Sequence, residues 1–128
     1  MPIDDPDFLT NPAKQLRAAQ ELATLRTRIV DLQTELLTRR HERRALIERL
    51  AEQDMRTQRE ERGRVSRTAA HDHARASQEV RNFDSNLRSL TEKIRRLAID
   101  AERYDLSLRV AIAAGHGARV EDEVIARG

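Results

Sequence analysis

Apolar residues recur at alternating steps of three and four residues in two long stretches of the chain. The first stretch contains Leu22, Leu25, Ile29, Leu32, Leu36, Leu46 and Leu50. The second contains Val80, Phe83, Leu87, Leu90, Ile94, Leu97, Ala101, Tyr104, Leu108 and Ala111. This spacing places the apolar side chains on one face of an α-helix and is typical of a coiled-coil seam. Arg39 and Arg43 occupy the two seam positions of the first stretch that are not apolar.

The residues that break helices lie almost entirely outside these two stretches. Proline occurs only at positions 2, 6 and 12, and glycine only at 63, 115, 117 and 128. Asn11 is suited to cap a helix, and Pro12 is suited to its first turn because its missing N–H needs no partner there. Gly115 and Gly117 predict the end of the helical region, since glycine easily adopts the left-handed conformation found at helix ends.

A turn at Gly63 would bring the two seams together in antiparallel order. Leu22 would then face Tyr104, and Leu46 would face Val80, so that each layer pairs the two kinds of heptad position. The sequence therefore predicts an all-α fold, a long antiparallel helical hairpin that forms a two-helix coiled coil with flexible tails. The alternative is one continuous long helix in an oligomeric coiled coil, because a glycine inside a helix costs only about 1 kcal/mol.

Three segments follow from this interpretation. Residues 1–12 are expected to be a flexible acidic tail, 13–114 the helical hairpin with its turn near Gly63, and 115–128 a C-terminal tail that can form a short helix. Several apolar residues lie off the seam and suggest a second contact face. They are Leu37, Ile47, Ile99, Leu106, Val110 and Ile112. A rod of two helices has little core of its own, so we expect self-association or docking into a larger assembly.

Charge adds a second kind of candidate surface. Charged residues make up 36% of the 128 residues, but the net charge is only +2, so most of them are expected to form a solvated helix surface. Two arginine clusters are candidate contacts for a protein partner or a polyanion. The first contains Arg39, Arg40, Arg43 and Arg44, and the second contains Arg56, Arg59, Arg62, Arg64 and Arg67. Arg39 and Arg43 can alternatively lay their methylene groups along the seam.

The sequence gives little support for catalysis, metal binding or base stacking. The absence of cysteine excludes disulfides, thiolate zinc sites and thiol catalysis. His71 and His73 are two residues apart, so on a helix they point in nearly opposite directions, and we expect them to be surface histidines rather than metal ligands. We predict no catalytic residues, cofactor, metal or small-molecule ligand. Aromatic residues are only 2% of the chain, which argues against platforms for base stacking.

The expected function is therefore that of a non-enzymatic structural or adaptor protein. It would self-associate or dock into a larger bacterial or phage protein assembly. One alternative is a basic helical protein that binds nucleic acid through its arginine clusters, and another is a stalk-like component of a secretion or export apparatus. No apolar run approaches the roughly 18 residues of a membrane span, and the acidic N-terminus does not resemble a signal peptide. The expected location is thus the cytoplasm or a phage particle.

Overall fold

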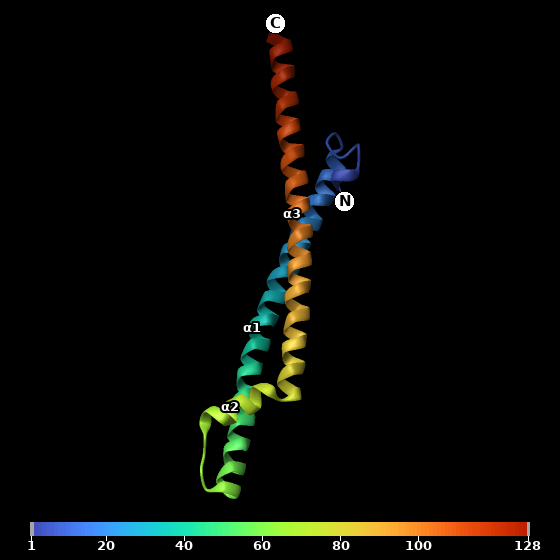
Figure 1. The fold of residues 1–128 in the computed structure, drawn as a ribbon. Coiled ribbons are helices and arrows are strands. Elements are labelled where there is room, and N and C mark those ends of the chain that lie inside the picture. The colour runs from blue at the N-terminus through green and yellow to red at the C-terminus, as the bar shows by residue number, and fades with distance from the viewer. Residues whose placement is uncertain (1, 128) are drawn as a thin grey trace. The chain divides into compact units, whose positions relative to one another are not determined.

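The computed structural model describes residues 2–127, with the side chains of Ile3 and 116–127 left out of the description. The described chain consists of helices and contains no strand (Figure 1). A short 3-10 helix, η1 (Pro2–Asp4), precedes the long helix α1 (Pro12–Arg62). The short helix α2 (Arg67–Ala76) and a second long helix, α3 (Gln78–Arg127), complete the order. The all-α class expected from the sequence is therefore confirmed.

The start of α1 agrees with the predicted cap. The Oδ1 atom of Asn11 accepts hydrogen bonds from the backbone N–H groups of Ala13, at 3.1 Å, and Lys14, at 3.4 Å. These bonds satisfy two of the donors that have no partner in the first turn of any helix. Pro12 is the first residue of α1, as predicted.

The end of α1 lies at the interior glycine. Gly63 follows the last helical residue and has a φ of 66°, a conformation that side-chain-bearing residues adopt only at a cost. Its N–H still donates to the Arg59 carbonyl at 3.1 Å, and the chain then leaves the helix. The alternative of one continuous helix is therefore wrong for this chain.

The return of the chain contains an element that the heptad pattern did not predict. Ser66 caps α2, because its Oγ accepts the N–H of Ala69 at 3.2 Å. At the other end of α2, Ser77 has an extended backbone, with φ −65° and ψ 152°. The Oγ of Ser77 then accepts the N–H of Val80 at 3.3 Å, within the first turn of α3. Serine thus marks both ends of α2.

The predicted helix end at Gly115 is wrong. Helix α3 continues through Gly115 to Arg127, so the segment that we expected to be a separate tail is part of this helix. A β-carbon added at Gly115 would meet nothing within 4 Å, so neither crowding nor an unusual backbone calls for glycine there. A glycine in an ordinary helical conformation weakens the helix by only about 1 kcal/mol and need not end it.

The chain forms two compact units, which we describe separately. Unit 1 joins the chain up to Val30 with the chain from Arg95 onward, and unit 2 is Asp31–Ile94. Each unit contains one stretch of α1 and one of α3. All fifteen large seam residues predicted from the sequence are buried or half-buried within their units. Among them, Leu22, Leu32, Leu46 and Val80 are buried, and Val80 has no exposed surface.

Ion pairs show that the two long helices run antiparallel within unit 2. Arg43 pairs with Asp84, whereas Arg49, farther along α1, pairs with Glu79, which comes earlier in α3. The core of this unit is a cluster of buried residues from all three helices, and Leu50, Met55 and Phe83 pack against it. The cluster contains Leu46, Ile47, Ala51, Ala70, Ala74 and Val80. Leu46 and Val80, which the predicted hairpin placed opposite each other, are both in this cluster.

Candidate interaction surfaces

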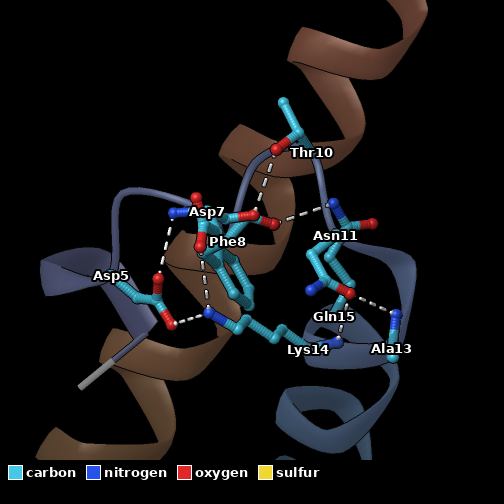
Figure 2. A network of polar contacts seen from close by, with 8 residues as sticks. All are labelled: Asp5, Asp7, Phe8, Thr10, Asn11, Ala13, Lys14 and Gln15. Atoms are coloured by element: carbon cyan, nitrogen blue, oxygen red, sulfur yellow. Dashed lines mark hydrogen bonds and ion pairs between the residues drawn. The ribbon is translucent and has the colours of Figure 1, made fainter.

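The N-terminal segment forms a clasp on unit 1. We use the name N-terminal clasp for residues 2–11 together with Lys14 and Gln15, whose polar contacts Figure 2 shows. Lys14 Nζ lies 2.7 Å from Asp5 Oδ2 and 3.6 Å from Asp7 Oδ2. Gln15 Nε2 donates to the carbonyl oxygens of Phe8, at 3.0 Å, and Leu9, at 3.2 Å. The segment is thus tied to the first turn of α1 by both charge and hydrogen bonds.

The centre of the clasp is apolar. The Phe8 side chain is only 3% exposed and clusters with Ala18 and Ala111, while Tyr104 and Leu108 pack against it. The small alanines on both helices leave room for the aromatic ring. Residues 1–12 were expected to be a flexible tail, but the described part of this segment is packed and hydrogen-bonded.

The ion pair of the clasp perturbs both of its members. The hydrogen bond from Lys14 lowers the pKa of Asp5, and the backbone N–H of Asp7 adds to this effect. The same hydrogen bond with Asp5 raises the pKa of Lys14. Both shifts favour the charged forms, so the pair is maintained across the neutral pH range.

An uncharged face lies along the solvent side of α1 in unit 1. Six exposed residues of α1 lie within about 50° of one direction on a helix of 3.6 residues per turn. They are Leu16, Ala19, Gln20, Ala23, Thr27 and Val30. None is charged, and Thr27 Oγ1 donates to its own helix at the Ala23 carbonyl, 3.0 Å away. We call this set the α1 outer face. Leu16 is 61% exposed and Val30 59%.

Helix α3 also exposes apolar side chains in unit 1. Leu106 is 55% exposed, and Ile99 and Val110 are 44% and 46% exposed. These three residues share one side of the helix, where Arg103 interrupts them. The sequence placed them off the seam, together with Leu37 and Ile112, and these two are also exposed, at 57% and 71%.

Ile47 does not belong to the second contact face that the sequence suggested. It is 6% exposed and forms part of the core of unit 2, together with Ala51, Ala70 and Ala74. Ala51 and Ala70 have no exposed surface at all. Their small side chains allow α2 to lie close against α1, and α2 covers a side of α1 that the two-helix prediction left open.

Two histidine–carboxylate pairs accompany this packing of α2 on α1. His71 Nε2 lies 3.2 Å from Glu48 Oε1, and His73 Nδ1 lies 3.2 Å from Asp54 Oδ2. The His73 side chain is exposed, as expected, but the His71 side chain is only 16% exposed. The prediction of a surface histidine is therefore wrong for His71, whose ring α1 covers.

The two seam arginines have different partners. Arg43 Nε donates to Asp84 Oδ1 at 2.6 Å and so joins α1 to α3 within unit 2. Arg39 instead turns to its own helix, where it lies 3.3 Å from Glu42 and 4.0 Å from Glu35. A hollow of about 400 Å³ lies beside Arg39. Its lining includes Phe83, Leu87 and Leu90 from α3, and Glu35 and Lys93 stand at its rim. The seam is therefore incompletely filled where arginine replaces an apolar residue.

The second arginine cluster lies where the chain turns back in unit 2. All five of its members are exposed, and none pairs with a carboxylate among the described residues. We call Arg56, Arg59, Arg62, Arg64 and Arg67 the tip arginines. Arg40 and Arg44 are likewise exposed and unpaired, whereas Arg39 and Arg43 are engaged as described above. The structure thus divides the two predicted clusters into paired and unpaired arginines.

Within residues 2–127 no three histidine, cysteine, aspartate or glutamate side chains that are described come together to hold a metal ion. In the same part of the chain, no helix has the length and apolar character needed to cross a membrane. His116 and the apolar residues Val120, Val124 and Ile125 lie beyond the side chains that the structure describes.

Comparisons with known proteins give no relative from which a function could be transferred. Neither the family models, nor the curated proteins, nor the solved structures contain a match to this chain.

Proposed function

We propose that this chain is a non-enzymatic structural or adaptor protein that works through its exposed helix faces. It associates with itself or docks onto another helical component of a larger assembly. The α1 outer face is the observation that supports this proposal most directly. In a chain with 36% charged residues, six exposed positions on one side of a helix carry no charge and include Leu16 and Val30.

Such a face is costly to leave in water and is suited to a helical partner. Leu16, Ala23 and Val30 recur at seven-residue intervals, the spacing at which one helix meets another along a seam. Leu37 continues the same spacing in the sequence. Covering a fully exposed aliphatic side chain contributes about 1.5–3 kcal/mol. Leu16 and Val30 are 61% and 59% exposed, so together they can supply about 2–4 kcal/mol to association.

Light scattering on purified protein tests self-association. We expect a mass of at least two chains of 14.7 kDa each. The double variant Leu16→Glu/Val30→Glu should weaken association at least about a hundredfold, because two buried carboxylates replace the apolar contact. A matched control is Thr24→Glu/Gln33→Glu, which adds the same charge at exposed positions of α1 outside the face and should associate as the natural chain does.

Crosslinking tests docking onto a different protein. A photo-crosslinking amino acid at Ala23 should give a covalent adduct in cells that make the protein, whereas one at Arg28, which points away from the face, should not. A purified chain that is monomeric at 100 µM, together with no adduct at Ala23, would overturn the proposal.

A further inference from the structure

The positive charge of this protein is concentrated at the turn of unit 2. The chain contains 24 basic and 22 acidic residues, with a net charge of +2. Residues 56–67 hold five of the basic residues, the tip arginines, and only two acidic ones, Glu60 and Glu61. This segment of twelve residues therefore has a charge of +3, and the remaining 19 basic and 20 acidic residues leave the rest of the chain at −1.

The tip arginines are free to bind a ligand, unlike many arginines elsewhere in the chain. Arg26, Arg39, Arg43, Arg49, Arg75 and Arg109 all lie within 4.0 Å of a carboxylate. No tip arginine lies this close to a carboxylate of a described residue, and all five are exposed. A ligand can therefore reach the tip arginines without first breaking an ion pair.

The backbone that displays these side chains is held by specific contacts. Gln58 Oε1 accepts the N–H of Ser66 at 2.8 Å, which ties the segment after Gly63 to the last turns of α1. Met55, just before Arg56, packs against the core of unit 2. Arg56, Arg59 and Arg62 follow one another at three-residue steps, so they form a slanted row with a rise of about 4.5 Å between neighbours. Arginines carried on a held backbone bind a charged ligand at a lower entropic cost than those of a flexible tail would.

The surroundings of the row favour a phosphate polymer over an acidic protein. Protein interfaces obtain most of their binding energy from buried aromatic or aliphatic anchors. Within 56–67 the only large apolar side chain is Val65, which is 40% exposed. Nucleic acids, in contrast, bind through charge alone, because each neutralised phosphate releases a condensed counterion. The planar guanidinium fork also matches two phosphate oxygens at once.

We propose that the tip arginines bind the sugar–phosphate backbone of nucleic acid without reading its sequence. Binding needs neither base stacking nor groove contacts, in agreement with the lack of aromatic residues in this segment. This activity is separate from association through the α1 outer face, which lies in unit 1.

The test is the salt dependence of binding to a fluorescent 20-base-pair duplex, measured by anisotropy. Three to five phosphate contacts give a slope of log K against log salt between about −2.7 and −4.5. From 50 to 200 mM salt, affinity should therefore fall between about 40-fold and 500-fold. Two duplexes of unrelated sequence should bind with the same affinity.

Matched variants locate the site. Arg56→Gln/Arg59→Gln/Arg62→Gln should weaken binding at 50 mM salt more than tenfold and make the slope shallower by about 2.7. The control removes the same charge from exposed arginines elsewhere that pair with no described carboxylate, as Arg28→Gln/Arg81→Gln/Arg88→Gln, and should keep the slope. If the first variant loses helicity, Arg64→Gln/Arg67→Gln tests the same site from the other side of the turn, with a loss of about 1.8 in slope.

Three results would overturn the proposal. The first is the absence of duplex binding at 50 mM salt. The second is equal weakening by the tip variant and the control, which would indicate attraction by net charge alone. The third is binding of polyglutamate without binding of the duplex, which would identify an acidic protein as the ligand.

Discussion

Arg39 and Arg43 occupy adjacent seam positions, but leucine substitutions at these two sites should have opposite effects on stability. Arg39 is 51% exposed and pairs only with Glu35 and Glu42 on its own helix. Arg43 is 32% exposed and joins the two long helices of unit 2 through Asp84. The sequence pattern treats the two residues alike, so this difference is a consequence of the structure alone.

For Arg39→Leu, the free energy gained by burying leucine should exceed that lost with the ion pairs. Ion pairs within one exposed helix contribute only about 0.2–0.5 kcal/mol each, so the substitution loses at most about 1 kcal/mol. A fully buried leucine contributes about 1.5–3 kcal/mol, and one half-covered by Phe83, Leu87 and Leu90 beside the hollow about 1–1.5 kcal/mol. Arginine and leucine have similar helix propensities. We therefore expect a gain of up to about 1 kcal/mol, which raises the melting temperature by about 2–4 °C for a chain of this size.

For Arg43→Leu the balance is reversed. The substitution removes a hydrogen bond of 2.6 Å between charged groups that links two helices. Such bonds contribute about 1.5–3 kcal/mol, and the lower value applies to a half-exposed pair. Leucine at this position recovers about 1 kcal/mol by burial, but Asp84, itself 37% exposed, is left without its partner. We expect a net loss of about 0.5–1 kcal/mol.

Urea denaturation followed by circular dichroism at 222 nm measures both effects. Two protein concentrations should be compared, so that a change in association is not mistaken for a change in folding. Arg40→Leu and Arg44→Leu are matched controls, since these arginines are exposed and pair with no carboxylate of a described residue. Each should change stability by less than about 0.5 kcal/mol. The reasoning is refuted if Arg39→Leu destabilises the protein or if Arg43→Leu is the more stable of the two seam variants.

Three further predictions concern single positions. Gly63→Ala should destabilise the protein by about 1–2 kcal/mol because of its φ of 66°, whereas Gly115→Ala, in open space within α3, should stabilise it by up to about 1 kcal/mol in the same denaturation assay. Lys14→Met should return the lowered pKa of Asp5 toward its ordinary value, as carboxyl NMR titration can show. Because that pKa is depressed in the folded protein, the ion pair stabilises the clasp at neutral pH. This stabilisation is lost as the pH falls through the lowered pKa. Phe8→Ala should detach the clasp, so that amide hydrogen exchange of residues 5–10 accelerates at least tenfold while α1 beyond its first turns stays protected; unchanged exchange would contradict the role of the ring.

The parts of the fold that were predictable from the sequence are those set by local chemistry and helical period. Asn11 and Pro12 mark the start of α1 because the cap and the first turn require only neighbouring residues. Gly63 marks its end because a positive φ favours glycine. The heptad positions of the large seam residues predict their burial, since the period alone assigns each one to a face.

Helix α2 was missed because alanine carries its packing. A heptad pattern is defined by large apolar residues, whereas α2 is held by Ala70 and Ala74 against Ala51. Alanine is common on exposed helix surfaces, so its burial is not visible in a sequence pattern. The signals that could have located this helix were Ser66 and Ser77, which are residues suited to mark helix ends.

The clasp and the last part of α3, from Gly115 onward, were missed for two different reasons. The burial of Phe8 depends on Ala111, more than one hundred residues away, and no local pattern reports such a contact. Gly115 was given too much weight, because its cost of about 1 kcal/mol is small for a helix anchored by many seam contacts upstream. The acidic composition of residues 1–12 therefore did not reveal that this segment is packed, and the glycine at 115 did not mark a helix end.

The arginines show why the two proposed activities can be tested independently. A charge count gives every arginine the same status, but an ion-paired guanidinium must give up its carboxylate before it can bind anything else. Arg43 would lose the 2.6 Å bond that joins two helices, so any ligand bound there would reduce the stability of unit 2. The tip arginines have no such bond with a described residue, and their neutralisation by phosphate should leave helix pairing intact. It follows that removing the tip charges should change salt-dependent binding without lowering the urea midpoint, whereas Arg43→Leu should lower the midpoint without changing the salt slope.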